Sequence, residues 1–206
     1  MKTAALSTAL FAALAVASPI DVRQESGCKA VTVLFARGTT EPGTLGVVVG
    51  PGLEKDLQSD LSADSVTFEG VSYPADGTGI MAEVAGSGPG STAMSSQANQ
   101  WLSKCPETKL VLTGYSQGAM AVHNAAKMLK GKSVFAAVTF GDPYKSQLVS
   151  GVPEDKFKSF CGAGDSVCSF GGCASAGGCQ SKSAAGHLGY SADLSDAAAF
   201  IKSVVA

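Results

Sequence analysis

The chain has 206 residues, of which 45% are hydrophobic, and a formal net charge of −2. Its 15 Lys and Arg nearly balance its 17 Asp and Glu, and no basic stripe is present, which argues against nucleic-acid binding. The N-terminal apolar stretch is too short for a membrane span and no other apolar run reaches that length, so stable membrane insertion is not expected.

The first residues have the pattern of a secretory signal peptide, predicted at 1–17. Lys2 supplies a positive start, 3–14 is short and apolar, and 15–17 (AVA) is a cleavage signal. We therefore expect an extracellular protein. Residues 18–27 are polar and follow no clear period, which indicates a mature N-terminal tail or a short pro-segment. The rest, 28–206, is long enough for one domain with its own core.

Strand-like and helix-like segments alternate along this domain. Apolar and β-branched runs predict five strands, at 31–36, 66–73, 109–113, 133–140 and 157–161. Helical patterns cover the second half of 46–62 and the ranges 91–104, 117–130 and 193–205. This alternation predicts an α/β fold with a five-stranded parallel sheet and helices on both faces. Functional side chains should then gather at the edge where the strands end.

The segment 114–118 (GYSQG) follows the third predicted strand and opens a predicted helix. It has the form G-x-S-x-G, in which a serine on a sharp strand-to-helix turn acts as a nucleophile. The helix N-terminus also favours negative charge beside this serine. We therefore predict Ser116 as the nucleophile. The motif alone leaves a chance match open, because the chain has 25 glycines.

A serine nucleophile needs a base, and the chain has only two histidines. His123 lies on the same predicted helix as Ser116, about 10 Å further along its axis, and is interpreted as a surface or packing residue. His187 lies in a loop before the final helix. It fits the chain order serine, acid, histidine of an α/β-hydrolase, so we predict His187 as the base.

Two aspartates that follow predicted strands could orient this base. Asp142 precedes Pro143, and a local hydrogen bond in an Asx turn explains it without catalysis. Asp165 lies in a short loop between two cysteines, and a disulfide there would fix the direction of its carboxylate. Because a triad acid must hold one imidazole tautomer, Asp165 is the favoured candidate.

All six cysteines fall in the predicted domain, and an even number in an exported chain predicts disulfides. Locality along the chain favours the pairs Cys28–Cys105, Cys161–Cys168 and Cys173–Cys179. A thiolate zinc site is the alternative, but the C-x2-C spacing typical of such sites is missing. We therefore expect no metal.

Ester chemistry also needs hydrogen-bond donors for an oxyanion. The backbone N–H of Gln117, directly after the nucleophile, is one candidate, and the loop after the first strand should supply another. In that loop Thr39 offers both a backbone N–H and a hydroxyl. The alternative is an ordinary turn in which Arg37 and Glu41 form a surface ion pair.

Five segments together resemble the fungal cutinase family: 35–46 (FARGTTEPGTLG), 105–119 (CPETKLVLTGYSQGA), 140–143 (FGDP), 161–168 (CGAGDSVC) and 187–190 (HLGY). The resemblance spans 28–206. It implies a secreted, monomeric serine esterase with a small three-layer α/β-hydrolase fold, an open site and no large lid. The family hydrolyses cutin, a plant polyester, and shorter esters, and uses no cofactor.

Carried over position by position, the resemblance implies the same nucleophile, acid, base and oxyanion donors. At Thr39 the family often has serine, which keeps the hydroxyl. The Cys28–Cys105 and Cys161–Cys168 pairs also match the family pattern, whereas Cys173 and Cys179 look additional.

Two loops, 73–90 and 169–186, depart from the family pattern. The first begins Y-P-A, as in acetylxylan esterases of the same superfamily, so removal of acetyl groups from xylan is the alternative function. A non-catalytic secreted binding protein is a more distant alternative. Candidate apolar residues for the rim of the site, each of which could equally belong to the core, are Ile80, Met81, Val84, Phe170 and Leu188.

Overall fold

The computed structural model describes residues 27–130 and 134–206, so the predicted signal peptide at 1–17 and positions 18–26 of the predicted tail lie outside the described residues. Its centre is a parallel sheet with the strand order β2–β1–β3–β4–β5. The strands are β1 (Val31–Ala36), β2 (Val66–Gly70), β3 (Lys109–Tyr115), β4 (Ala136–Phe140) and β5 (Phe157–Phe160).

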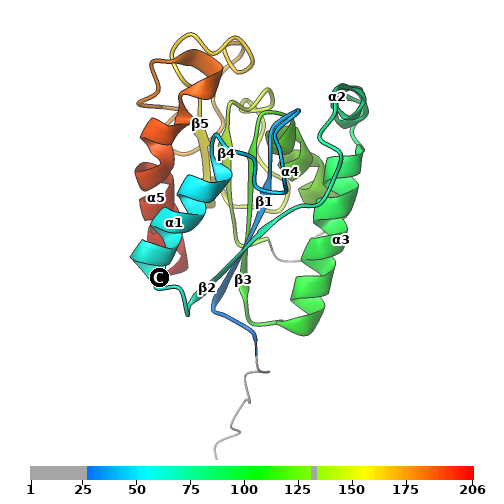
Figure 1. The fold of residues 1–206 in the computed structure, drawn as a ribbon, viewed down its shortest axis with the longest axis vertical. Helices are drawn as coiled ribbons and strands as arrows, with labels where there is room; N and C mark the ends of the chain where they lie inside the picture. The colour runs from blue at the N-terminus through cyan, green and yellow to red at the C-terminus, as the bar shows by residue number, and fades with distance from the viewer. Residues whose placement is uncertain (1–26, 131–133) are drawn as a thin grey trace, which may run out of the picture.

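Helices cover both faces of this sheet, which confirms the predicted three-layer α/β class. They are α1 (Gly50–Leu61), α2 (Gly77–Val84), α3 (Pro89–Lys104), α4 (Gln117–Met128) and α5 (Leu194–Val205). Figure 1 shows α1 and α5 together on one side of the sheet and α3 and α4 on the other. Within the described ranges, no helix combines the length and the apolar character needed to cross a membrane.

The central strands are largely apolar because both of their faces are buried. In β1, Val31, Val33 and Phe35 pack into the core beneath α1 and α5, whereas Leu34 and Ala36 pack into the core beneath α3 and α4. Successive side chains of a strand point to opposite faces, so a strand with a helix layer on each side needs apolar side chains on both faces.

Helix α2 is the element that the sequence pattern did not reveal. The side chain of Asp76 caps it by accepting a hydrogen bond from the backbone N–H of Gly79, at 2.8 Å. Helix α3 begins at Pro89, earlier than predicted, because proline is well suited to the first turn of a helix. Strand β2 ends at Gly70, so the expected strand to residue 73 was too long.

Three disulfides hold the loops around this framework. They join Cys28 to Cys105, Cys161 to Cys168, and Cys173 to Cys179. The first ties the chain before β1 to the end of α3, and the other two lie in the long connection between β5 and α5.

Candidate active site

Ser116 occupies a sharp turn between β3 and α4. Its φ of 57° and ψ of −118° form a backbone conformation that is costly for any residue with a side chain. The flanking glycines are required by space, because a Cβ on Gly118 would lie 1.9 Å from the carbonyl oxygen of Ala36. A Cβ on Gly114 would lie 2.2 Å from the carbonyl oxygen of Gly118. The turn therefore presents the serine hydroxyl at the carboxyl edge of the sheet.

His187 bridges Ser116 and Asp165. Its Nε2 lies 2.9 Å from Ser116 Oγ, and its Nδ1 lies 2.8 Å from Asp165 Oδ2. An ionised carboxylate can only accept hydrogen bonds, so Nδ1 carries the proton and Nε2 is left to accept from the serine hydroxyl. The Asp165 side chain is fully buried, whereas the His187 side chain is 27% exposed. The ring thus connects a buried charge to a nucleophile at the surface.

Three elements position these groups. Ser116 follows β3, Asp165 follows β5 in the loop closed by Cys161–Cys168, and His187 lies in a short 3-10 turn (Gly186–Leu188). Tyr115 carries the ring that packs beside His187, with centroids 5.0 Å apart, and its hydroxyl donates to the carbonyl oxygen of His187 at 2.8 Å. This contact fixes the loop of the histidine to the strand of the serine.

The carboxylate of Asp165 is surrounded by donors. Burial disfavours its charged form, but hydrogen bonds from the Tyr190 hydroxyl, from His187 and from the backbone N–H of Val167 outweigh this effect. Together they hold the pKa of Asp165 below its ordinary value, so the group is a carboxylate at neutral pH. Sequence reasoning missed Tyr190, which reaches Asp165 only because the chain turns back after His187.

His123 and Asp142, which were not chosen as base and acid, pair with each other. Asp142 Oδ2 lies 2.9 Å from Nε2 of His123, and both side chains are fully buried, so a surface position for His123 was wrong and a packing role fits. Asp142 Oδ1 accepts from the backbone N–H of Tyr144 at 2.7 Å, as expected of an Asx turn. Across residues 27–130 and 134–206, no group of three or more His, Cys, Asp or Glu could hold a metal.

The two candidate oxyanion donors are neighbours. Thr39 Oγ1 donates to the side-chain oxygen Oε1 of Gln117 at 3.2 Å, and Gln117 Nε2 donates to the carbonyl oxygen of Asp76 at 3.3 Å. Gln117 is the first residue of α4, where backbone N–H groups have no acceptor within the helix. The loop after β1 and the start of α4 thus both present donors beside Ser116.

The loop after β1 is held by a framework that the sequence did not predict. Arg37 is buried, and its guanidinium donates to the carbonyl oxygens of Glu41 and Tyr73, each at 2.7 Å. The Glu41 carboxylate accepts from the backbone N–H groups of Gly38, Val47 and Val48. The alternative of a surface ion pair between Arg37 and Glu41 is therefore wrong, because both charged groups bind backbone groups instead.

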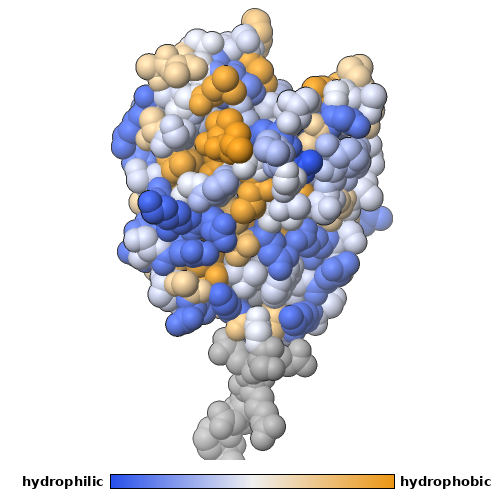
Figure 2. All heavy atoms as spheres, viewed as in Figure 1, coloured by the Kyte–Doolittle hydropathy of each residue, from blue (hydrophilic) through white to orange (hydrophobic). Residues whose placement is uncertain are grey.

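A cavity of about 370 Å³ opens beside Ser116 and His187. Its remaining lining is mostly apolar, with Thr39, Thr40, Glu41, Pro42, Val47, Val48, Tyr115 and Leu188. Figure 2 shows apolar surface gathered on the upper half of the molecule, toward the edge at which the strands end. The cavity therefore has polar groups beside the serine and aliphatic side chains, those of Pro42, Val47, Val48 and Leu188, along its wall.

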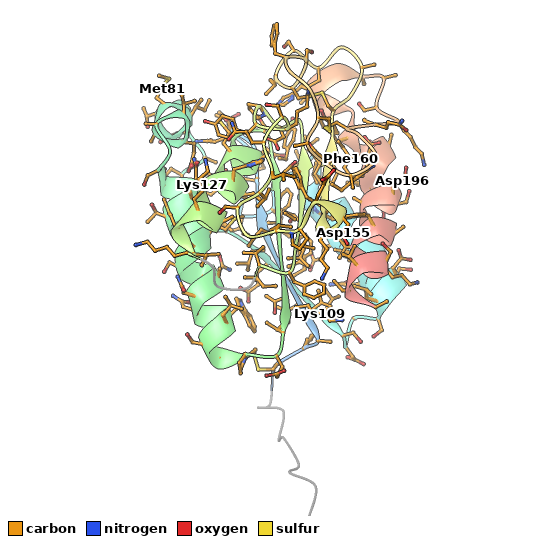
Figure 3. The ribbon with its side chains drawn as sticks, turned by 180° about the vertical axis from the view of Figure 1, so that it is seen from behind. Met81, Lys109, Lys127, Asp155, Phe160 and Asp196 are labelled. Atoms are coloured by element: carbon orange, nitrogen blue, oxygen red, sulfur yellow. A yellow bond between two sulfur atoms is a disulfide. The ribbon has the colours of Figure 1, made fainter. Side chains whose placement is uncertain are left out.

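Of the five predicted rim residues, Leu188 lines this cavity and the other four do not. Met81, Val84 and Phe170 are exposed, and Ile80 is half-buried. Figure 3 shows Met81 on α2 pointing away from the sheet. Sequence reasoning missed Val47 and Val48; the signal for them is the apolar run VVV after a glycine in the loop that follows β1.

The segment 169–186 is anchored by the side chain of Lys145. Lys145 Nζ donates to the carbonyl oxygens of Gly171 and Gly172 at 2.8 and 2.7 Å, and this lysine is only 6% exposed. The Cys173–Cys179 disulfide closes the adjacent part of the segment. The additional loop is therefore anchored at two points next to the segment that carries His187.

Comparison with protein families gives a match to one family model, described as Cutinase, over residues 27–205. The chain is 44% identical to a cutinase of Botryotinia fuckeliana, with 98% of each protein covered. It is 46% identical to cutinase 4 of Emericella nidulans, over 89% of this chain and 75% of that protein.

Comparison with solved structures also finds a cutinase, together with an acetylxylan esterase. A Trichoderma reesei cutinase in complex with a phosphonate inhibitor matches with a TM-score of 0.73 and 39% identity, over 87% of this chain and 78% of that one. An acetylxylan esterase matches with a TM-score of 0.64 and 28% identity, over 87% of this chain and all of that one.

Proposed function

This chain belongs to the cutinase family and is a carboxylic ester hydrolase, and from this premise we propose that Ser116, His187 and Asp165 form its catalytic triad. The observation that carries the proposal is the single imidazole with one nitrogen on the serine hydroxyl and the other on a buried carboxylate. A hydroxyl is a poor nucleophile until such a base takes its proton.

Acylation begins when Ser116 Oγ attacks the ester carbonyl while His187 Nε2 takes the hydroxyl proton. The carbonyl oxygen becomes an oxyanion, which the backbone N–H of Gln117 and a donor from Thr39 stabilise. Asp165 stabilises the imidazolium and keeps its own charge. When the tetrahedral intermediate collapses, His187 gives the proton to the departing alkoxide, and the alcohol leaves behind an acyl-serine.

Deacylation repeats these steps with water as the nucleophile. His187 takes a proton from the water as its oxygen attacks the acyl carbonyl, and the same donors bind the second oxyanion. Collapse of this intermediate breaks the bond to Ser116 Oγ, which recovers its proton from His187. The products are a free carboxylic acid and the regenerated serine.

We further propose cutin as the substrate and the extracellular space as the place of action. The aliphatic wall formed by Pro42, Val47, Val48 and Leu188 suits the hydrocarbon chain of a fatty hydroxy acid better than a sugar ring. Disulfides of the kind that persist outside the cell, and a predicted signal peptide, support export. The exposed position of Val47 and Leu188 gives an insoluble polymer access to the site.

The triad is tested with Ser116→Ala and a soluble nitrophenyl butyrate. We expect kcat to fall by about 10⁴-fold or more, since oxyanion donors alone leave only residual catalysis. Ser96→Ala, on the exposed side of α3, is the matched control and should keep wild-type kcat. Wild-type turnover by Ser116→Ala would refute the assignment.

The substrate is tested by two releases measured side by side with the same enzyme: hydroxy fatty acids from purified cutin and acetate from acetylated xylan. We expect release from cutin, and higher kcat/KM for butyryl and hexanoyl esters than for the acetyl ester. Release of acetate from xylan together with a strong preference for acetyl esters would instead assign the chain to the acetylxylan reaction, which its second structural neighbour makes the alternative.

A further inference from the structure

We propose that Tyr190 is a positioning residue of the active site, which shares the carboxylate of Asp165 with His187 and thereby limits how strongly that carboxylate holds the imidazole. The inference rests on the proposed triad. It concerns the distribution of one negative charge between two hydrogen-bond donors, and no contact between Tyr190 and substrate is involved.

The neighbours of the Tyr190 hydroxyl fix the direction of its hydrogen bond. The backbone N–H of Gly162 donates to Tyr190 Oη at 3.1 Å, so the phenol oxygen already acts as an acceptor. The phenol hydrogen is then directed to Asp165 Oδ2, which can only accept. The same oxygen, Oδ2, accepts from His187 Nδ1 at 2.8 Å. One carboxylate oxygen therefore serves two donors.

The second oxygen of the carboxylate has its own partner. Asp165 Oδ1 accepts from the backbone N–H of Val167 at 2.8 Å, within the loop closed by Cys161–Cys168. Both oxygens of the carboxylate are thus held, and Oδ2 stays shared between Tyr190 and His187.

The interaction is strong because it is buried. Tyr190 and Asp165 are both fully buried, and the Tyr190 ring is wedged edge-on against Tyr115 and Phe140, each with centroids 5.9 Å away. Burial and the nearby carboxylate raise the pKa of Tyr190, so the phenol stays protonated as a donor over the whole working range. Hydrogen bonds to a charge in such a low-dielectric setting are worth more than they are in water.

The pH dependence of catalysis follows from this sharing. A donor on Oδ2 draws charge away from it, and the oxygen then stabilises the imidazolium form of His187 less. Without the phenol hydrogen, the carboxylate would hold the imidazolium more strongly, and the base would remain protonated up to a higher pH. Loss of the hydroxyl therefore moves the acid limb of the pH–rate profile to higher pH.

Other titratable groups also face His187, and the Tyr190→Phe substitution leaves them unchanged. Tyr115, at the end of β3, packs on the imidazole, and burial raises its pKa, so it remains neutral. Glu41, from the loop after β1, lines the same cavity, and its carboxylate is held by three backbone N–H groups. Because neither contacts the Tyr190 hydroxyl, a shift caused by its removal reports on Asp165.

The test is Tyr190→Phe, which removes one oxygen and keeps the buried ring. We expect the acid limb of kcat/KM for a soluble nitrophenyl ester to move upward by about half to one pH unit. The proton resonance of His187 Nδ1–H should also move downfield, because its hydrogen bond no longer shares Oδ2. A merely structural role would lower stability or activity and move neither quantity.

Tyr144→Phe is the matched control, since its hydroxyl contacts the carbonyl oxygen of Glu83 at 3.4 Å, away from the triad. It should show the wild-type profile. An acid limb of Tyr190→Phe that coincides with wild type, or lies at lower pH, overturns the inference even if activity falls. This outcome is distinct from failure of the triad itself, which would show as activity in Ser116→Ala.

Discussion

At the scale of single residues, the hydroxyl of Thr39 is already oriented before substrate arrives. It donates to Gln117 Oε1 at 3.2 Å, and the β-methyl group restricts rotation about χ1. The oxygen of the hydroxyl is thereby held in place, so only its hydrogen has to turn from Gln117 Oε1 to the substrate oxygen when charge develops there. The methyl group that distinguishes threonine from serine thus helps to keep the hydroxyl in place.

Thr39→Val keeps the shape of the side chain and removes this donor. We expect kcat on a nitrophenyl ester to fall by about 10²–10³-fold, because oxyanion stabilisation is lost mainly in the transition state. Thr39→Ser, which keeps the hydroxyl, should stay within about tenfold of wild type. Equal rates for the valine and serine variants would mean that the hydroxyl plays no part in catalysis.

At the scale of elements, a buried carboxylate anchors α2 to its neighbours. Glu83 is fully buried and accepts from the backbone N–H of Ser91 at 2.8 Å and from Asn124 Nδ2 at 2.9 Å. Its carbonyl oxygen also accepts from Asn124 at 2.8 Å. The carboxylate therefore joins the end of α2 to the first turn of α3, where helix N–H groups favour an anion, and to α4.

Removal of this carboxylate should loosen α2 and lower global stability. Glu83→Ala leaves the backbone N–H of Ser91 and one of the two N–H groups of Asn124 Nδ2 without an acceptor, and we expect a loss of about 2–4 kcal/mol in the free energy of unfolding. The measurement is the urea midpoint at constant m-value. Glu107→Ala, an exposed glutamate in the turn after α3, should change the midpoint little. Equal midpoints for the two variants would contradict the anchoring role.

At the scale of the whole molecule, the three disulfides close loops of very different length. Cys28 and Cys105 are separated by 77 positions, whereas Cys173 and Cys179 are separated by 6. In the chain-entropy description, the longer loop restricts the unfolded chain more, so the first bond should contribute about 4.5 kcal/mol and the last about 2.4 kcal/mol. The additional disulfide would thus act mainly on its own loop.

Two double variants compare these contributions directly. Urea unfolding should show a larger loss for Cys28→Ser with Cys105→Ser than for Cys173→Ser with Cys179→Ser. The second pair should also keep turnover of a small ester, because the contacts of Lys145 with Gly171 and Gly172 still hold the loop. A larger loss from the short loop would show that folded-state contacts, and not chain entropy, dominate.

The sequence predicted those elements whose pattern reflects burial. The apolar run of β1 and the helical pattern of α4 were recognisable, because a strand or helix packed in a core needs those residues. Helix α2 was not predicted because its glycines and short length give no period. Its stability comes from the local cap of Asp76 and from the tertiary contacts of Glu83.

The residues of the candidate site also differ in whether the sequence predicted them. Ser116 carries a motif, and with only two histidines in the chain the order of residues was sufficient to pick His187 as the base. Asp165 was preferred to Asp142 because it lies in a short loop between two cysteines. The cavity wall was predictable only for Leu188, since Val47 and Val48 reach the site through the fold of the loop after β1. The buried roles of Arg37 and Tyr190 depend on where backbone groups lie, which no residue pattern records.

The two ends of the described domain lie at the edge of the sheet opposite the cavity. Cys28 is tied to the end of α3 before β1 begins, and Lys109, at the start of β3, donates through its ammonium group to the carbonyl oxygen of Val205. Figure 1 marks the C-terminus at the lower end of α5, far from the loops that carry Ser116 and His187. A tether attached at Ala206 would therefore leave the catalytic face pointing outward, toward a solid substrate such as a film or a leaf surface.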